Sequence, residues 1–380
     1  MLNDLKSKKY FFSFMIISIL IIISCSNHKD NKLIISEFGK LDNNKTVFKY
    51  TLNNSNNVSF SVINYGAIIT NLYVPDSSGE TIDVVLGFDN LENYIQGHPY
   101  FGSVVGRFGN RIENGEFMLN DLKYSLALNN DTNSLHGGIK GFDKVYWEYV
   151  ESSNPLNTIK FRYLSKDMEE GFPGNLEVFI SYTLTEKNEI IVAYEAVTDN
   201  STIINLTQHS YFNLSGESSG KILDHKLSID ADYFLPVKKN MIPSGELRLV
   251  KETPFDFSIP KEIGLEINSK NNQIQIGNGY DHCWVLNNFD GSVRKVADAK
   301  SNSSGIQMEV YSDQPGIQLY TGNFLDGSIV SKKKNKYEKN SGFCLETQHF
   351  PNSPNEDNFP TVVLNPGEKY DTTTVFKFIL

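Results

Sequence analysis

Two neighbouring segments alternate apolar and polar residues, and this pattern constrains the fold more than any other feature. Every second residue from Leu176 to Leu184 is large and apolar, and Glu189–Thr198 repeats the same alternation. A period of two places alternate side chains on one face of a β-strand. Because only the polar residues 186–188 separate the two runs, the pattern predicts a β-hairpin with one buried face.

Strand-like runs recur through the rest of the chain and are separated by turn signals rich in Asn, Pro and Gly. The further candidates are Thr46–Leu52, Val58–Tyr65, Ile68–Val74, Thr158–Leu164, Ile306–Ser312 and Val375–Leu380. No stretch keeps a helical period over three turns, and no linker or fixed repeat divides the chain. We therefore predict an all-β fold, a large antiparallel β-sandwich with few short helices, in one domain over residues 36–380.

The N-terminal segment predicts export and lipidation. Three lysines precede an apolar stretch at residues 11–23, which is short for a membrane span and typical of a secretory signal. Cys25 follows directly after Ser24 and resembles the lipobox cysteine of bacterial lipoproteins. We expect residues 1–24 to be a lipoprotein signal peptide and residues 25–35 to be a lipidated cysteine with a polar tether. The alternatives are an ordinary signal peptide or an uncleaved anchor.

That resemblance implies a bacterial cell-envelope protein held to a membrane, on the periplasmic side or at the cell surface, by the lipid on Cys25. The formal net charge is -10, and removal of residues 1–24 makes it -12. Nucleic acids require a basic footprint, so this charge argues against such a partner. The lysine run at residues 332–334 is interpreted as a solvated loop. Cys283 and Cys344 could form one disulfide, but two cysteines do not make a disulfide framework, and two buried free thiols are favoured.

Three regions combine glycine, polar and titratable residues in a way that a plain strand would not. The first contains Gly106–Ile112 and Asn133–Gly138, the second is Leu206–Leu214, and the third contains Gly279–His282, Pro315–Asn323 and Cys344–Pro351. In this order they resemble the galactose mutarotase (aldose 1-epimerase) family, from about Phe48 to the C-terminus. The strings His209-Ser-Tyr-Phe-Asn-Leu214 and Leu345-Glu-Thr-Gln-His-Phe350 carry most of the resemblance.

The resemblance implies a galactose mutarotase-like supersandwich that interconverts the α and β anomers of a free aldose such as glucose or galactose. Ring opening needs one base at the C1 hydroxyl and one acid at the ring oxygen. His209 matches the general acid, with an ordinary imidazole pKa of about 6.5, and Glu346 matches the general base, with a carboxyl pKa of about 4.3. His136 matches an assisting histidine near the ring oxygen.

The remaining matches imply a set of sugar-binding residues: Asn110, Arg111, His136, Asp281 and Gln318. Asp281 would accept from two hydroxyls, and Gln318 would position Glu346 or a hydroxyl. Arg107, His282 and His349 adjoin the motifs and are predicted to be structural. The reaction transfers no electrons or phosphate, and the sequence has no nucleotide-binding glycine loop or tight metal-ligand spacing, so we expect neither a cofactor nor a metal.

Other readings of the same residues remain open. A hexose 6-phosphate epimerase would need extra cations at the rim of the site. A glycoside hydrolase could use Asp281 and Glu346 as its carboxylate pair. A non-catalytic sugar-binding lipoprotein would not need both His209 and Glu346. The expected partner is a small-molecule aldose, and the protein is expected to be a monomer or a weak dimer.

Overall fold

A computed structural model describes residues 33–380, and the predicted signal peptide and Cys25 lie outside these residues. The described chain is almost entirely β, with two short helices, α1 (Leu91–Gln96) and α2 (Asn272–Gly277). Each helix begins at an asparagine, Asn90 or Asn271, whose side chain accepts a hydrogen bond from a backbone N–H of the first turn. Among the described residues, no helix is long and apolar enough to cross a membrane.

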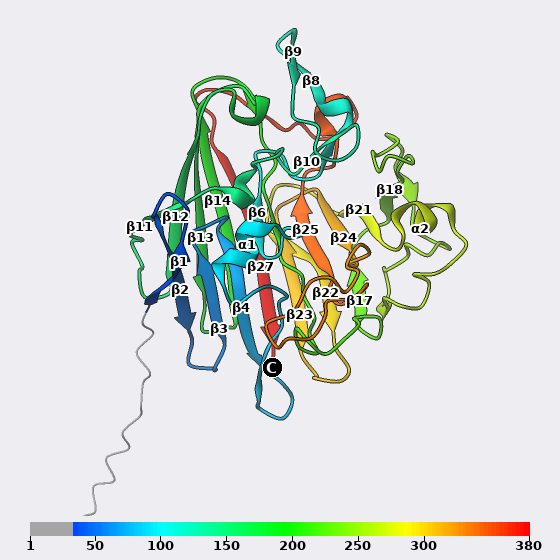
Figure 1. Cartoon of the computed structure of the whole chain (residues 1–380). Coiled ribbons are helices and arrows are strands. Elements are labelled where there is room, and N and C mark those ends of the chain that lie inside the picture. The colour runs from blue at the N-terminus through cyan, green and yellow to red at the C-terminus, as the bar shows by residue number, and fades with distance from the viewer. Residues whose placement is uncertain (1–32) are drawn as a thin grey trace, which may run out of the picture. The chain divides into compact units, whose positions relative to one another are not determined.

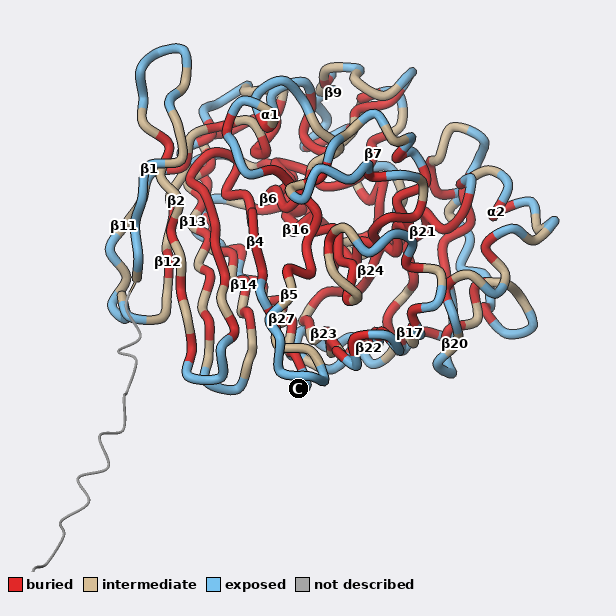
Figure 2. Tube along the Cα trace, turned by 60° about the horizontal axis from the view of Figure 1, so that its bottom comes forward, coloured by how far each residue is buried: buried red, intermediate tan, exposed pale blue. Residues whose placement is uncertain are grey.

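The largest sheet has nine strands and contains the predicted hairpin. Its strands, in spatial order, are β11 (Glu148–Val150), β12 (Thr158–Ser165), β13 (Leu176–Leu184), β14 (Glu189–Thr198), β27 (Tyr370–Ile379), β23 (Gln307–Ser312), β22 (Arg294–Lys300), β17 (Lys226–Ile229) and β20 (Lys261–Glu262). Buried and partly exposed residues alternate along β12, β13 and β14 (Figure 2). Both strands of the predicted hairpin are confirmed with the predicted ends.

A five-stranded sheet covers one part of this nine-stranded sheet (Figure 1). Its strands are β1 (Ile34–Lys40), β2 (Thr46–Asn53), β3 (Ser59–Ile63), β4 (Ile68–Pro75) and β5 (Thr81–Asp83), in that order. The rings of Phe60 and Tyr182 lie 5.6 Å apart between the sheets, and the Tyr182 hydroxyl donates to the Ala67 carbonyl at 2.7 Å. This packing confirms the predicted sandwich of antiparallel sheets.

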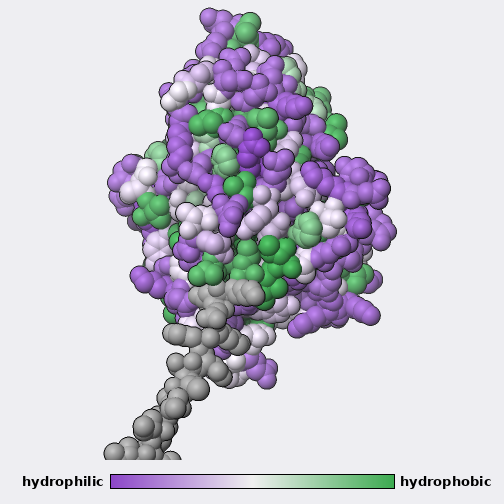
Figure 3. Space-filling model, turned by 90° about the vertical axis from the view of Figure 1, so that its left-hand side faces the viewer, coloured by the Kyte–Doolittle hydropathy of each residue, from purple (hydrophilic) through white to green (hydrophobic). Residues whose placement is uncertain are grey.

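The first described strand begins earlier than the predicted domain. β1 starts at Ile34, inside the range 25–35 that was assigned to the tether, because its backbone pairs with β2 from Ile34↔Thr51 onwards. Ile34 and Ile35 are about half exposed. The side of the molecule near β1 and β11 is largely hydrophilic, with several separate groups of hydrophobic side chains (Figure 3).

A second five-stranded sheet carries the polar motifs of the C-terminal region. It consists of β19 (Arg248–Leu249), β18 (Tyr233–Leu235), β21 (Asp281–Val285), β24 (Gly316–Tyr320) and β25 (Cys344–Gln348). The apolar face of these strands, with Trp284, Ile317 and Leu345, belongs to the same hydrophobic core as the large sheet. The opposite face carries the polar side chains of the motifs, and we call this sheet the site sheet.

Four short strand pairs complete the strands: β6 (Ser103–Val105) with β16 (Thr207–His209), β7 (Arg111–Ile112) with β10 (Ser134–Leu135), β8 (Glu116–Leu119) with β9 (Leu122–Ser125), and β15 (Thr202–Ile203) with β26 (Val363–Leu364). The first two pairs contribute residues to the cavity over the polar face of the site sheet. Four 3₁₀ turns, at Glu113–Gly115, Phe142–Lys144, Glu169–Gly171 and Ser353–Asn355, complete the described secondary structure.

The interpretation of residues 332–334 as a solvated loop is wrong for Lys332. Its ammonium group is buried and lies 2.7 Å from the Asp83 carboxylate, and it also donates to the carbonyls of Thr70 and Val85. These contacts fix the loop that joins β24 to β25. Cys283 and Cys344 are both buried free thiols, as favoured from the sequence.

Candidate active site

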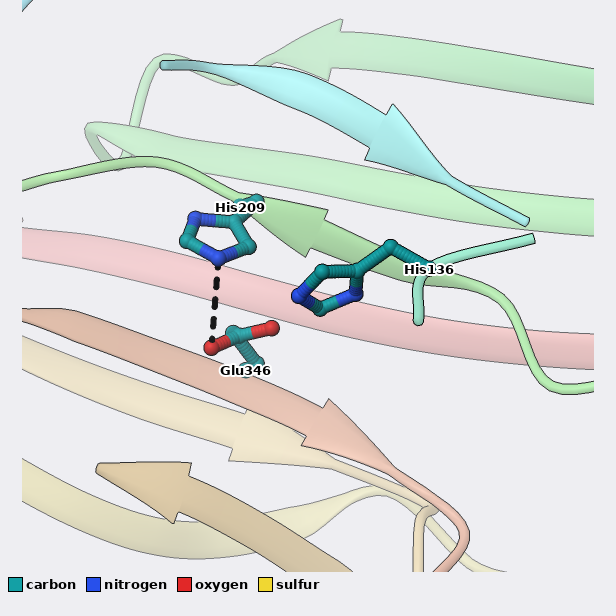
Figure 4. A group of neighbouring side chains, drawn as sticks. All are labelled: His136, His209 and Glu346. Atoms are coloured by element: carbon teal, nitrogen blue, oxygen red, sulfur yellow. Dashed lines mark ion pairs between the residues drawn. The ribbon is translucent and has the colours of Figure 1, made fainter. Parts of the chain in front are cut away.

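A cavity of about 370 Å³ lies over the polar face of the site sheet. All but one of the sequence-predicted site residues line it: Asn110, Arg111, His136, His209, Asp281 and Glu346. They come from segments up to 236 residues apart in sequence, and the sheet and the short strand pairs bring them together. Figure 4 shows His136, His209 and Glu346 pointing toward one another.

His209 and Glu346 form a close pair of titratable groups at the floor of this cavity. Nε2 of His209 lies 3.7 Å from Oε1 of Glu346. His209 is the last residue of β16 and pairs with Ser103 of β6, whereas Glu346 lies in the middle of β25. The second carboxylate oxygen of Glu346 has no hydrogen-bond partner in the described structure, although it is buried. It is therefore free to accept a proton or a hydroxyl hydrogen.

The ordinary pKa values expected for this pair are wrong for the site. Burial lowers the pKa of His209 to about 4. Burial also raises the pKa of Glu346 well above its usual value, and the nearby Asp281 carboxylate adds to this effect while Arg111 opposes it. Removal from water penalises whichever form is charged. In the absence of a sugar, burial therefore favours a neutral imidazole beside a protonated carboxyl.

A reciprocal pair of hydrogen bonds fixes His136 above this floor. The N–H of Asn110 donates to Nδ1 of His136 at 3.1 Å, and the N–H of His136 donates to the Asn110 carbonyl at 3.1 Å. Asn110 and His136 both have left-handed backbone angles, with φ of 67° and 53°. The following Gly137 has no room for a side chain, because a Cβ would lie 1.9 Å from the Gly106 carbonyl oxygen. These constraints explain why the two N-terminal motifs occur together.

Arg111, Asp281 and Gln318 form a linked polar group at one wall of the cavity. Nη2 of Arg111 lies 3.8 Å from Oδ2 of Asp281, and Nε of Arg111 donates to Asn130 at 2.9 Å. Gln318, the one predicted residue that does not line the cavity, donates from Nε2 to Oδ1 of Asp281 at 2.7 Å. It sits beside Glu346 in register but contacts Asp281. Burial raises the pKa of Asp281, and Arg111 opposes that shift.

The residues predicted to be structural lie outside the cavity lining. His282 is fully buried, accepts a hydrogen bond at Nδ1 from the Asp281 N–H, and packs its ring 4.7 Å from Phe255. Nδ1 of His349 lies 2.9 Å from Oε1 of Gln314. Arg107 is buried among backbone carbonyls.

Several residues of the cavity were not identified from the sequence. Tyr211 and Tyr320 stand inside the motifs that were found, so their positions alone could have suggested them. Tyr100, whose ring centroid is 4.5 Å from that of His136, and Asn130 lie in segments without a distinctive pattern. The remaining lining residues, for which the sequence gives no signal, are Pro99, Asp131, Leu135, Lys239, Asn240, Met241 and Phe324.

The side chains of His136, His209 and Glu346 could also be considered as metal ligands, because one ligand atom from each lies within 4.8 Å of the others. A metal-bound histidine normally donates its second ring N–H to a carboxylate or carbonyl. His136 has the opposite arrangement, since its Nδ1 accepts from a backbone N–H. In the neutral ring Nε2 must then carry the proton, which suits a donor to a sugar oxygen better than a metal ligand.

Fold and site together define an antiparallel β-sandwich protein with a buried acid–base pair at the floor of a polar cavity. Sequence comparison matches residues 49–377 to the family described as aldose 1-epimerase. The chain belongs to the aldose 1-epimerase family. Solved structures share the fold: galactose 1-epimerase from Lactobacillus acidophilus NCFM has a TM-score of 0.80 at 28% identity, covering 92% of this chain and 98% of that one.

Named relatives match nearly the whole described chain. Galactose mutarotase from Bos taurus is 49% identical over 335 residues, which cover 88% of this chain and 94% of the relative. The protein of the same name from Homo sapiens is 47% identical over 344 residues, covering 90% and 97%. Aldose 1-epimerase from Escherichia coli K12 is 35% identical over 331 residues, covering 87% and 94%.

Proposed function

We propose that this chain is an aldose 1-epimerase (mutarotase) that interconverts the α and β anomers of free hexoses by acid–base ring opening. The observation that carries this proposal is the buried pair of His209 Nε2 and Glu346 Oε1, 3.7 Å apart at the floor of a cavity with polar walls. The relatives named galactose mutarotase support galactose as a substrate, and glucose, which differs only in the orientation of one hydroxyl, is the natural second one.

The proton count of the pair fits both halves of the reaction. An imidazolium beside a carboxylate and a neutral imidazole beside a carboxyl carry the same total number of protons. The two forms differ only in which partner holds the exchangeable proton. In ring opening, Glu346 takes the proton of the C1 hydroxyl while His209 gives its proton to the ring oxygen. The sugar becomes an open aldehyde, and the pair ends in the neutral form that burial favours. Rotation about C1–C2 and the reverse transfers then close the ring on the other face.

The other polar residues hold the sugar during these transfers. Nε2–H of His136 points a neutral donor at the ring-oxygen region, and this role needs no change of protonation. Arg111 and Asp281 present donors and acceptors to hydroxyl pairs, and Gln318 fixes the Asp281 carboxylate through its hydrogen bond. Holding the sugar in one orientation is essential because both proton transfers require short, aligned contacts.

The decisive experiment is polarimetry on purified residues 26–380 with fresh α-glucose and α-galactose. The wild-type protein should accelerate the optical-rotation change, and Glu346→Gln and His209→Asn should each lower kcat by about 10²- to 10⁴-fold. Glu309→Gln is the matched control, because Glu309 of β23 pairs with Lys295 of β22 and does not line the cavity. This variant should retain wild-type kcat. Wild-type activity in either site variant would refute the assigned roles, and no acceleration by the wild type would favour a sugar-binding protein.

The lipid anchor is a second part of this proposal and rests on the sequence. Cys25 follows an apolar signal-like stretch, and the family match begins only at residue 49, so the leader is separate from the family domain. A chain lipidated in this way would act on sugars in a bacterial cell envelope. Cys25→Ser should move the protein from the membrane fraction to the soluble fraction without lowering mutarotase activity. Retention of the variant in the membrane fraction would contradict lipidation at Cys25.

A further inference from the structure

The two nitrogens of the His209 ring have different partners, both supplied by one strand. Nε2 faces Glu346 at 3.7 Å, and Nδ1 lies 3.5 Å from Sγ of Cys344. Cys344 and Glu346 are two residues apart on β25, so their side chains point to the same face of the strand. Cys344 is fully buried and does not line the cavity, which means that it reaches the sugar only through His209.

His136 shows what a different partner at Nδ1 does to a histidine. Its Nδ1 accepts the backbone N–H of Asn110. A backbone N–H can only donate, so a proton on Nδ1 of His136 would face another proton. His136 is therefore restricted to the neutral form with its hydrogen on Nε2. The ring can donate to a sugar oxygen but cannot take up and release a proton in each turnover.

A thiol imposes no such restriction, because it can both donate and accept weakly and can rotate about Cβ–Sγ. Burial raises the pKa of the Cys344 thiol, so it remains protonated and neutral. A carboxylate in this place would favour imidazolium permanently, since it can only accept. An alanine would leave Nδ1 without a partner in either state.

We propose that Cys344 is a positioning residue that lets His209 alternate between imidazolium and imidazole: its Sγ accepts from Nδ1–H in both states, so that the proton exchanged with the sugar is the one on Nε2. This inference rests on the proposed acid–base function of His209. The neutral ring then keeps its hydrogen on Nδ1, and Nε2, the nitrogen that faces Glu346 and the cavity, is free to take up the proton again.

Several groups other than Cys344 also influence the titration of His209 and must stay constant in any test. Glu346 faces Nε2 from β25, Tyr211 lies against the ring from the segment that follows β16, and Tyr320 lies against it from β24. His136 and Tyr100 lie on the remaining side, and the charge of His209 is coupled to that of His98. None of these residues is altered in the variants below.

The test compares Cys344→Ala and Cys344→Ser with Cys283→Ala in residues 26–380. Cys283 is the matched control: it is also a buried thiol, but its Sγ lies near the Trp284 carbonyl, and its packing cluster contains Leu235, Phe350 and Phe359. Polarimetry gives kcat and KM, and ¹⁵N-histidine NMR gives the tautomer and the titration of His209.

Cys344→Ala should lower kcat about fivefold, the loss expected for one hydrogen bond, with KM within about twofold because Cys344 does not touch the sugar. Cys344→Ser should recover most of kcat, since a hydroxyl also donates and accepts. The neutral His209 ring should carry its proton on Nδ1 in the wild type and in the serine variant, and lose this preference in the alanine variant. Cys283→Ala should match the wild type in all three measurements.

The proposal is overturned if Cys344→Ala keeps wild-type kcat and the wild-type tautomer, or if alanine and serine are impaired equally. If the alanine variant does not fold, the serine variant decides: a proton on Nε2 of its neutral His209 refutes the proposed contact. The tautomer of His209 can be measured in the absence of turnover. A wild-type protein without mutarotase activity would therefore refute the proposed function, while the NMR result would still test the contact between Cys344 and His209.

Discussion

Arg107 and Arg111 stand four residues apart in one motif, yet their surroundings differ in kind. The Arg107 side chain is 2% exposed and donates to carbonyls of Pro173 and Gly174 at 2.7 and 3.0 Å and to the Ser165 hydroxyl at 2.6 Å. Burial lowers its pKa to about 10, which still leaves it charged near neutrality. The Arg111 side chain makes one hydrogen bond, to Asn130, and its approach to Asp281 at 3.8 Å is too long for another.

The difference separates a charge that holds the fold from a charge that is available to a ligand. The Arg107 guanidinium donates hydrogen bonds to three segments of the chain and thereby stabilises their packing. Arg111 keeps donors directed at the cavity, where a sugar hydroxyl can take them. The same distinction applies to the carboxylates: Asp83 is satisfied by Lys332, Asn71 and the Leu72 N–H, whereas Glu346 has an unpartnered oxygen.

The largest expected effect is the loss of the buried Arg107 charge. Arg107→Met should lower the free energy of unfolding by about 3–5 kcal/mol, because several carbonyls would lose their only charged donor inside the protein. Urea denaturation followed by tryptophan fluorescence measures this. Arg162→Met on β12 is the control, since that half-exposed arginine pairs with Glu177 at the surface and should cost about 1 kcal/mol or less. Equal urea midpoints for the two variants would contradict the structural role of Arg107.

Arg111→Met should lower catalytic activity much more than stability, the reverse of the effect expected for Arg107→Met. We expect kcat/KM for glucose to fall about 10²-fold, corresponding to ~2–3 kcal/mol for charge-assisted hydrogen bonds to sugar hydroxyls. The free energy of unfolding should change much less than in the Arg107 variant. Arg111→Lys should recover little, because an ammonium group lacks the planar fork of donors. A polarimetric kcat/KM equal to the wild type would remove Arg111 from the binding site.

A pH titration extends the comparison to a structural histidine. Burial lowers the pKa of His282 to about 3, far below the value of about 6.5 in an unfolded chain. The unfolded chain therefore binds a proton that the native ring does not, and the stability due to the neutral ring is complete above pH 6.5 and lost as pH falls. In His282→Gln, the slope of unfolding free energy against pH near pH 5 should be shallower by about 1.4 kcal/mol per pH unit. Parallel curves for variant and wild type would show that the ring is protonated in the native state.

The smallest expected effect concerns the single hydrogen bond that holds Arg111. Asn130→Ala removes the acceptor of Arg111 Nε while Asp281 still attracts the guanidinium. We expect kcat/KM to fall about fivefold, or ~1 kcal/mol, with no loss of stability. The paired readout is polarimetry and urea denaturation. An unchanged kcat/KM would mean that Asp281 alone positions Arg111.

The parts of this structure that sequence reasoning predicted share a local signal. The hairpin of β13 and β14 follows from alternation within twenty-odd residues, and the site residues follow from motifs that resemble a known family. The pKa shifts of His209 and Glu346 have no local signal, because segments far apart in the chain bury them. The short site strands β21, β24 and β25 were not predicted as strands, since covering segments bury their polar face as well as their apolar face. Asn130 was missed because it lies in a segment without a distinctive pattern.

The position of β27 gives the fold one more property. This last strand of the chain lies between β14 and β23, in the middle of the nine-stranded sheet (Figure 1). Without it, β11–β14 and β23–β22–β17–β20 would be two separate sheets with open edges. During synthesis, the core and the cavity above it therefore cannot close until β27 has left the ribosome. A chain terminated before β27 should remain a substrate for proteases, because the two halves of its large sheet cannot join.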